Sequence, residues 1–307
     1  MQTLADQIKK RIVFKKPNAT TTTVKTYYSL INHLLKTKDD SAKLVDWEWI
    51  DNQPESVIEF VSEFYKERPL ATIKTLFAAL YAITENKVYH AHMMKLSAEY
   101  AKEQMKQKKS EKQQNNWISF QDVERYVQSA YNAARPYLSS KTPLEGLPLQ
   151  IVQEYIILAL TTGVFIAPRR SQDWTEMKLR GVSTRSKDPK EYNYIKGNSF
   201  HFVKYKTASV YGEQVIEIPK QLKNLLNKWK KLNQHDFLLV NADGSQMSVV
   251  RIAQILNRIF GKNISTGMLR HIYITDKLGH IPSLEDMQNM AEDLGHSVPM
   301  MLEYIKH

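Results

Sequence analysis

A stretch without a single apolar side chain divides this chain into two parts. Residues 106–116 read Lys-Gln-Lys-Lys-Ser-Glu-Lys-Gln-Gln-Asn-Asn. A hydrophobic core cannot continue through such a segment, because the segment has nothing to bury. The length of 307 residues is also typical of about two domains. We therefore expect two cores joined by a linker at 106–116, whose lysines either face solvent or lie along a polyanion.

The first part of the chain has the apolar spacing of helices. Apolar residues recur at intervals of three and four after the threonines at 20–23, which suit a helix N-cap. Similar spacing follows Pro69, which occupies a typical first helical position, and we expect two further helices at 57–64 and 88–105. We expect a small all-α domain over residues 20–105. Residues 1–19 carry two basic clusters, which predict a basic N-terminal arm, a nuclear localisation signal or a solvated, frayed terminus.

The second part, residues 117–307, combines helices with a small sheet. Ser119 and Asp122 are spaced as in a capping box, and the apolar run 149–160 predicts a buried helix. Between 192 and 218, β-branched and aromatic residues interrupted by glycines predict a small antiparallel sheet. Helical spacing then resumes. The expected fold class is mainly α with a small antiparallel β-sheet.

Positive charge is in excess in both parts. The chain has 43 Lys and Arg against 32 Asp and Glu, a formal net charge of +11. Residues 1–116 contribute +5 and the remainder +6, so the excess is not confined to a tail. Both parts can therefore face nucleic acid. A basic enzyme without any nucleic-acid role has the same composition, and charge alone does not separate these two interpretations.

Composition and motifs exclude several kinds of site. The absence of cysteine excludes disulfides, zinc fingers and thiol catalysis. His90 and His92 are two positions apart, which places them on different faces of a helix rather than in a ligand pair. No P-loop, dinucleotide fingerprint or metalloprotease motif occurs, so we expect no metal and no cofactor. With no apolar run of ~18 residues and no signal-peptide pattern, we expect a cytoplasmic or nuclear protein that is neither secreted nor membrane-bound.

Arginines lie in apolar surroundings at two places in the second part. Arg169 and Arg170 follow the buried helix and precede Asp173. Arg270 lies in an apolar helical segment, and a Leu-Gly-His-Ser sequence and a tyrosine follow near the end of the chain. An arginine in apolar surroundings is costly unless it is paired. An ion pair with Asp173 would explain Arg170. It would not explain why Arg270, the Leu-Gly-His-Ser sequence and the tyrosine follow in this order.

In this order, the motifs resemble those of the tyrosine recombinases, the phage-integrase family. The family pattern is an arginine shortly before an acidic residue, a lysine on a β-hairpin, a His-x-x-Arg, a Leu-Gly-His and a tyrosine. The matching positions are Arg170 with Asp173, Lys206 followed by Thr207, Leu269-Arg270-His271, Leu294-Gly295-His296-Ser297 and Tyr304. The resemblance implies a helical core-binding domain at 20–105 and a mixed α+β catalytic domain at 117–307.

The reaction implied by this resemblance is a transesterification on double-stranded DNA. The oxygen of Tyr304 attacks a phosphodiester, a 3′-phosphotyrosine forms, and the 5′-hydroxyl leaves. The steps then reverse with a different 5′ end. The resemblance also implies a homotetramer on synapsed DNA, assembled from free monomers, with no cofactor. Site-specific recombination or integration, as in a mobile element or virus, is therefore the leading hypothesis.

The matched residues suit this chemistry. Arg170 and Arg270 are planar and permanently charged, so they can clamp a phosphate whose charge grows in the transition state. Lys206 is assigned to protonate the leaving 5′-oxygen. His296 is assigned a hydrogen bond to the same phosphate, and Asp173 is expected to orient Arg170.

One position departs from the family pattern. Gly267 stands where the histidine of His-x-x-Arg would be, which leaves the general base unassigned. His271 follows Arg270, but on a helix its side chain points ~100° away. We therefore expect His271 to pack or to position a neighbour, as a supporting residue.

Three residues compete with the matched ones. Arg169 adjoins Arg170, but the three-residue spacing to the acidic residue favours Arg170. Lys204 shares a predicted strand and face with Lys206, and Lys206 fits the family pattern better. Tyr273 is expected in the core.

Two other functions stay open. A type IB topoisomerase uses a similar set of residues, although the Leu-Gly-His-Ser sequence and the helical first domain favour a recombinase. A DNA-binding relative that has lost catalysis is supported by Gly267.

Overall fold

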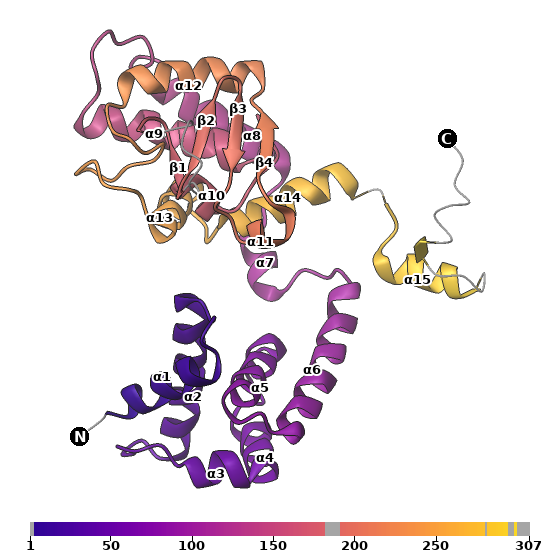
Figure 1. The fold of residues 1–307 in the computed structure, drawn as a ribbon. Coiled ribbons are helices and arrows are strands. Elements are labelled where there is room, and N and C mark those ends of the chain that lie inside the picture. Colours follow the sequence, from indigo (N-terminus) through magenta and orange to yellow (C-terminus); the bar gives the residue numbers. More distant parts are fainter. Residues whose placement is uncertain (1–2, 182–190, 280, 294–297, 300–307) are drawn as a thin grey trace. The chain divides into compact units, whose positions relative to one another are not determined.

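The computed structural model describes residues 3–181, 191–279, 281–293 and 298–299, without the side chains of 290–293. The chain forms two compact units. One comprises Met1–Lys108 with Ser283–His307, and the other comprises Lys109–Pro282. Within the described residues, no helix is both long enough and apolar enough to cross a membrane. The structure is mainly helical with one small sheet (Figure 1), which confirms the coarse fold class.

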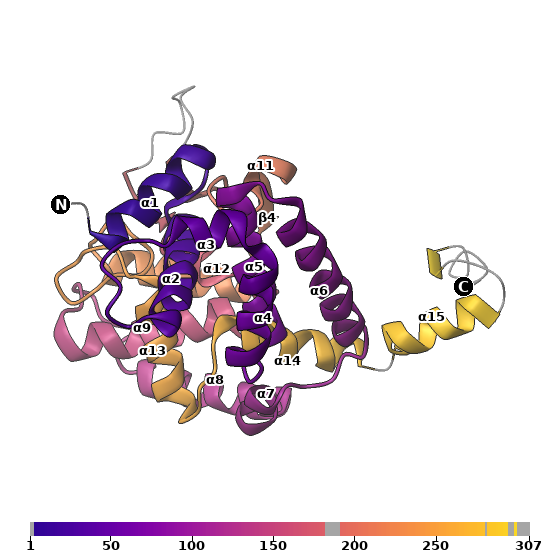
Figure 2. The ribbon, with the colours of Figure 1, turned by 90° about the horizontal axis from the view of Figure 1, so that it is seen from below.

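The first unit is built from helices (Figures 1 and 2). They are α1 (Leu4–Lys15), α2 (Thr21–Lys38), α3 (Trp47–Asn52), α4 (Pro54–Phe64), α5 (Leu70–Thr84), α6 (Lys87–Met105) and α15 (Leu284–Asp293). Helices α2, α4, α5 and α6 lie where the apolar spacing predicts them. Their apolar faces form one core, and α5 contributes much of it, with Leu76, Phe77, Leu80 and Ile83 fully buried.

The N-terminal residues differ from the expected arm. Residues 4–15 form α1, which begins with a capping box between Thr3 and Asp6. Ile8 and Ile12 are fully buried in the core of the first unit. Arg11 pairs with Asp51 at 2.7 Å. Between the basic residues, Leu4, Ile8 and Ile12 form an apolar stripe at helical spacing. This segment therefore packs as a helix and is neither an arm nor a frayed terminus.

The expected linker is partly helical. Ser110 caps α7 (Glu111–Asn116), none of whose residues is buried. The end of α7 is held to the second unit, because the Asn263 amide donates to Asn116 Oδ1 at 2.7 Å. The boundary between the units therefore falls at Lys108 and Lys109. Local capping is enough to form this helix although it buries no apolar surface.

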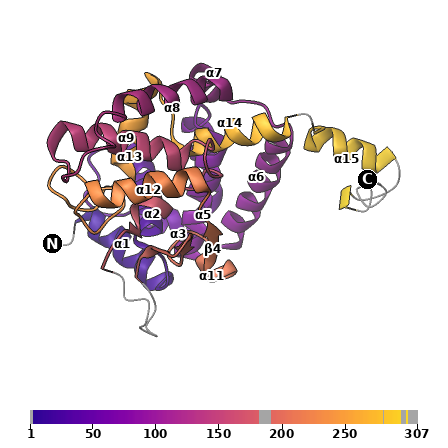
Figure 3. The same cartoon turned by 90° about the horizontal axis from the view of Figure 1, so that it is seen from above.

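The second unit surrounds its small sheet with helices. Its helices are α8 (Phe120–Ala134), α9 (Gly146–Thr161), α10 (Ser171–Thr175), α11 (Ala208–Tyr211), α12 (Lys220–Leu232), α13 (Val249–Phe260) and α14 (Thr266–Leu278). The apolar run predicted as a buried helix is α9, and Ile156 to Leu160 are fully inaccessible to solvent. Helix α12 packs alongside α9 (Figure 3) and buries a leucine stripe and Trp229.

The sheet is mixed rather than antiparallel. Its strands are β1 (Met177–Lys178), β2 (Asn193–Lys196), β3 (Ser199–Phe202) and β4 (Gln214–Glu217), in that order across the sheet. The expected antiparallel pairing holds for β2, β3 and β4, but β1 pairs parallel to β2. Strand β1 was missed because it has only two residues, too short for an alternating pattern to appear in the sequence.

The compact unit that contains the sheet ends at Pro282, whereas the sequence predicts a domain that extends to residue 307. The Leu284 amide, at the start of α15, donates to Gln107 Oε1 at 2.9 Å, within the first unit. The order of motifs along a sequence does not reveal which core a terminal segment contacts. His296 and Tyr304 lie outside the described residues.

Candidate functional site

A polar pocket of about 250 Å³ brings together residues from three separate segments of the second unit. Pro168, Arg169, Arg170 and Asp173 come from the loop after α9 and from α10. Tyr205, Thr207, Tyr211 and Gln214 come from the connection between β3 and β4 and from the start of β4, and Arg270 comes from α14; together these residues line the pocket. Two of the predicted arginines, 100 positions apart in the sequence, thus face one hollow.

Arg169 is committed to contacts within the protein. Its Nε donates to Asp173 Oδ2 at 2.8 Å, and its NH1 donates to Gln214 Oε1 at 3.0 Å. The guanidinium lies 3.9 Å from the centre of the Phe202 ring, a favourable cation–π distance. The sequence spacing predicts Arg170 as the partner of Asp173, and this is wrong for the ion pair itself. Arg169 forms this pair from the loop before α10, whose extended N-cap residue is Arg170.

Asp173 is a buried carboxylate, and only one of its two oxygens has a hydrogen-bond partner among the described residues. Its side chain is 2% exposed, and Oδ1 has no hydrogen-bond partner within the described residues. Burial raises the pKa of Asp173 above its ordinary value, while the positive charges of Arg169, Arg170 and Arg270 act to lower it. One carboxylate is therefore surrounded by three guanidiniums.

Arg170 and Arg270 retain free hydrogen-bonding capacity. Neither forms an ion pair or a side-chain hydrogen bond with any residue the structure describes, and the buried Nε of Arg270 lacks a partner. Arginine presents five N–H donors in a planar fork. Three guanidiniums around one carboxylate leave a positive excess at the pocket. An anion of the size of a phosphate can satisfy both the charge and the free donors.

A buried hydroxyl pair connects the segments that carry the two arginines. The hydroxyls of Ser171 and Thr266 are 2.8 Å apart, and both residues are less than 9% exposed. Ser171 follows Arg170 directly, and Thr266 opens the helix that carries Arg270. The Ser265 side chain caps that helix by accepting from the Met268 amide. These bonds fix the start of α14 against the start of α10.

The two candidate lysines differ in their partners. Both lie beyond the end of β3, in the connection to β4, rather than on a strand as predicted. Lys204 Nζ is 3.1 Å from Glu176 Oε2. Lys206 is exposed and has no ion pair or hydrogen bond with the part of the chain that the structure describes. Its neighbours Tyr205 and Thr207 line the pocket, which places Lys206 beside it.

Asn193 fixes the start of this connection to the arginine-bearing segment. This residue is fully buried. Its Nδ2 donates to the carbonyl of Asp173 at 2.8 Å, and its Oδ1 accepts from the amides of Val203 and Lys204 at 2.9 and 2.8 Å. One side chain therefore bridges α10 to the chain leaving β3.

Helix α14 also holds the residues around Arg270. Gly267 lies in its first turn, where an added Cβ would meet only Ser265 Oγ, at 3.4 Å. His271 is exposed and does not line the pocket, so the expectation that it packs is wrong. Tyr273 packs on the core beside Phe120, with ring centres 6.0 Å apart, as expected.

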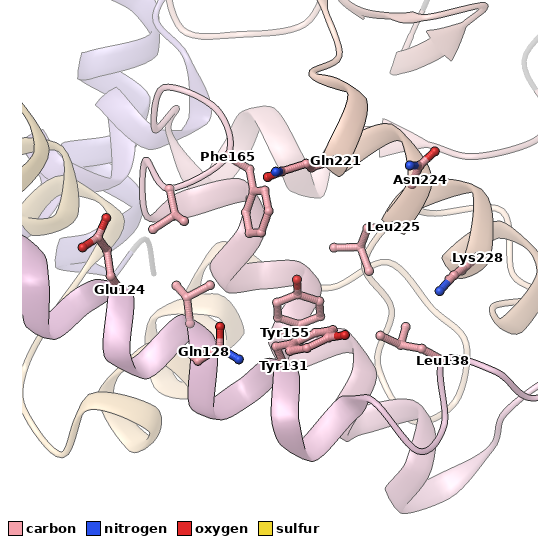
Figure 4. A pocket seen from close by; sticks show the side chains of 12 residues that line it. Glu124, Gln128, Tyr131, Leu138, Tyr155, Phe165, Gln221, Asn224, Leu225 and Lys228 are labelled. Carbon is pink, nitrogen blue, oxygen red and sulfur yellow. The ribbon is translucent and has the colours of Figure 1, made fainter.

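A larger hollow, of about 580 Å³, lies elsewhere in the second unit (Figure 4). Tyr131, Tyr155 and Phe165 give it aromatic walls, and Gln128, Asn224 and other polar residues surround them. It contains none of the residues that the motifs predict. In the first unit, the His90 ring contacts Tyr81 in a tilted arrangement, and the His92 ring contacts Phe77 edge-to-face. Among the described residues, no group of three or more His, Asp or Glu could hold a metal ion.

Comparisons with known proteins add no family. Neither the models of known protein families nor the curated proteins give a match to this chain. The geometry of the pocket and the sequence motifs therefore carry the functional interpretation.

The motifs missed the residues that hold the pocket together. Ser171, Asn193, Gln214 and Thr266 act through side-chain bonds to segments far away in the sequence. Their residue types are common in loops and at helix caps, so nothing in the sequence marks them. The only sequence feature that points to a role for Arg169 is its position next to Arg170.

Proposed function

We propose that this protein is a site-specific DNA recombinase or integrase of the tyrosine recombinase type. One observation supports this proposal most directly. Arg170, Arg270 and the residues flanking Lys206 meet at one pocket, and both of these arginines lack partners among the described residues. This is the arrangement that a scissile phosphodiester would require.

Arg170 and Arg270 would bind the non-bridging oxygens of the phosphate. Each guanidinium can donate two parallel hydrogen bonds, and its charge is independent of pH in the physiological range. As the phosphorus becomes five-coordinate, negative charge on its equatorial oxygens increases, so the contacts strengthen in the transition state. Asp173 would limit electrostatic repulsion between the guanidiniums around it.

The proposed step needs no redox partner. The phenolic oxygen of Tyr304 forms a bond to phosphorus and gives its proton to solvent water, while the bond from phosphorus to the 5′-oxygen breaks. Lys206 would supply a proton to that 5′-oxygen. Reversal with a different 5′ end reseals the strand. His296 and Tyr304 enter this step from the sequence motifs.

Double-stranded DNA is the proposed partner, and a homotetramer on two synapsed duplexes is the proposed assembly. Residues 1–116 and 117–307 both carry surplus Lys and Arg, which suits contacts to phosphates along a duplex. Because such contacts release counterions, DNA affinity is expected to fall steeply with salt.

Formation of a covalent adduct tests the proposal. The protein is incubated with a duplex nicked close to the target phosphate, so that the short 5′ product diffuses away, and the mixture is separated on a denaturing gel. We expect a labelled protein–DNA adduct that Arg170→Ala and Arg270→Ala each reduce strongly. A duplex library in place of a single sequence covers the unknown target. An adduct that persists in both variants would contradict the proposed clamp.

A DNA-binding relative without catalysis is the second candidate, and Gly267 favours it. The family pattern has a histidine there that assists proton transfer. Binding to duplex DNA with no adduct on any sequence of the library would support this candidate and exclude the first.

A further inference from the structure

We propose that Arg169 is a positioning residue for Lys206. It ties the two ends of the β3–β4 connection to the segment that carries Arg170, and so holds the lysine beside the scissile phosphate. This inference rests on the proposed function, because that function makes Lys206 the general acid.

The contacts of Arg169 reach both ends of the connection. Phe202, whose ring lies under the guanidinium, is the last residue of β3. Gln214, which accepts from NH1, is the first residue of β4. Tyr205, inside the connection, has its ring centre 5.4 Å from the same guanidinium. One side chain therefore spans the opening of the loop formed by residues 203–213, and its ion pair with Asp173 anchors it to α10.

Lys206 depends on this anchoring because its side chain has no ion pair or hydrogen bond with the described residues. It is exposed and lies in the turn that precedes α11. Within the connection, the Tyr205 hydroxyl donates to the carbonyl of Gly212 at 2.7 Å, which joins the two sides of the loop. Asn193 holds residues 203 and 204, and Arg169 contacts both Tyr205 and Gln214.

The same contacts set Arg169 apart from the phosphate clamp. Its side chain is only 16% exposed, and its Nε, its NH1 and one face of its guanidinium are already engaged. Arg170, the next residue, has no such partners and stays available. The double arginine thus divides two tasks between neighbouring residues, one facing the phosphate and one facing the loop.

Substrates with oxygen or sulfur at the bridging 5′ position separate these tasks. A thiolate leaves without a proton, so sulfur removes the need for a general acid. We expect Arg169→Ala to slow cleavage of the oxygen substrate by about 10- to 100-fold, because a displacement of ~1 Å in a catalytic group costs about that much. On the sulfur substrate it should cleave within about threefold of wild type, as Lys206→Ala should. Arg170→Ala should stay slow on both substrates.

A double variant and a milder variant sharpen the test. If Arg169 acts through Lys206, Arg169→Ala/Lys206→Ala should be no slower than Lys206→Ala alone, since coupled residues are not additive. Gln214→Leu removes one Arg169 hydrogen bond and leaves the pair with Asp173, so it should give a smaller, sulfur-rescued defect even if Arg169→Ala folds poorly.

Arg180→Ala is the matched control. Arg180 is another partly buried arginine of the second unit, and it donates to the carbonyls of Asn233 and Lys230, away from the pocket. Its loss should leave the ratio of rates on the two substrates unchanged.

Hydrogen exchange gives a readout that does not need activity. The amides of Ala208, Val210, Tyr211 and Gly212 are bonded within the connection. They should exchange faster in Arg169→Ala and in Gln214→Leu but not in Arg180→Ala, while α9 stays protected in all three. A defect that sulfur does not rescue, with unchanged exchange in the connection, would overturn the proposal. If wild type forms no adduct on any substrate, the proposed function fails, and exchange alone decides whether Arg169 holds this loop.

Discussion

Arg169→Met should destabilise the second unit through the carboxylate that it leaves behind. In the folded protein, Arg169 Nε lies 2.8 Å from Asp173 Oδ2, and the two side chains are 16% and 2% exposed. Removing one partner of a buried pair costs ~3–5 kcal/mol, because the remaining charge is uncompensated. Methionine keeps apolar contact with Phe202, and the charges of Arg170 and Arg270 act in the same direction as the lost one. We therefore expect a loss at the lower end, about 3 kcal/mol.

The loss should depend on pH in a defined direction. Burial already raises the pKa of Asp173, and Arg169 opposes this increase, so the variant should raise the folded-state pKa further. A carboxyl group with a raised folded pKa destabilises the protein only when it is ionised. The penalty is therefore complete above the folded pKa, and it decreases as the pH falls towards the ordinary value of 3.8. The gap between variant and wild type should narrow on acidification.

Urea unfolding, followed by tryptophan fluorescence, measures the effect. Trp174 and Trp229 are fully buried in the second unit. Adding Asp173→Asn to Arg169→Met removes the unpaired charge and should bring the free energy of unfolding back to within ~1 kcal/mol of wild type. The control is Arg258→Met, whose pair with Glu154 has side chains that are 61% and 22% exposed and so contributes at most ~1 kcal/mol. The reasoning is refuted if Arg169→Met loses no more than this control, or if Asp173→Asn restores nothing.

Four further outcomes are expected. Tyr304→Phe should abolish covalent adducts. DNA affinity, measured by gel shift, should stay nearly unchanged, because affinity comes from many phosphate contacts. Adducts formed by this variant would mean that another tyrosine attacks. Cleavage should persist in excess EDTA, because two arginines neutralise the phosphate, whereas activity that magnesium restores after chelation would exclude this mechanism. Lys206→Ala should slow cleavage by ~10²–10⁴-fold, and a bridging 5′-sulfur should restore the rate. Lys204→Ala should show a smaller defect that sulfur does not restore, since Lys204 pairs with Glu176. The reverse pattern would make Lys204 the general acid. Gly267→His should fold normally, because its Cβ meets only Ser265 Oγ at 3.4 Å, and should speed cleavage if that histidine is the missing proton carrier; a slower variant would argue against this role.

Several of the helices, and the residue types at the candidate site, can be predicted from the sequence alone. Apolar spacing located α2, α4, α5, α6 and α9, because a helix must bury a stripe that recurs every three to four residues. It also placed Arg170 and Arg270 among the important residues, since unpaired arginines in apolar segments need a reason. The acidic neighbour Asp173 was found by its spacing. Residues 4–15 have the same apolar periodicity, but their basic clusters are also typical of a disordered arm, so α1 was not predicted.

The roles of these residues depend on contacts that form only in the folded protein. The choice of Arg169 over Arg170 as the partner of Asp173 depends on Phe202 and Gln214, which approach from strands more than 30 positions away. The difference between Lys204 and Lys206 depends on Glu176, which lies across the fold. The hydroxyl pair of Ser171 and Thr266 spans 95 positions. Local sequence carries periodicity and charge, but a hydrogen bond between distant segments exists only once the core has brought their backbones together.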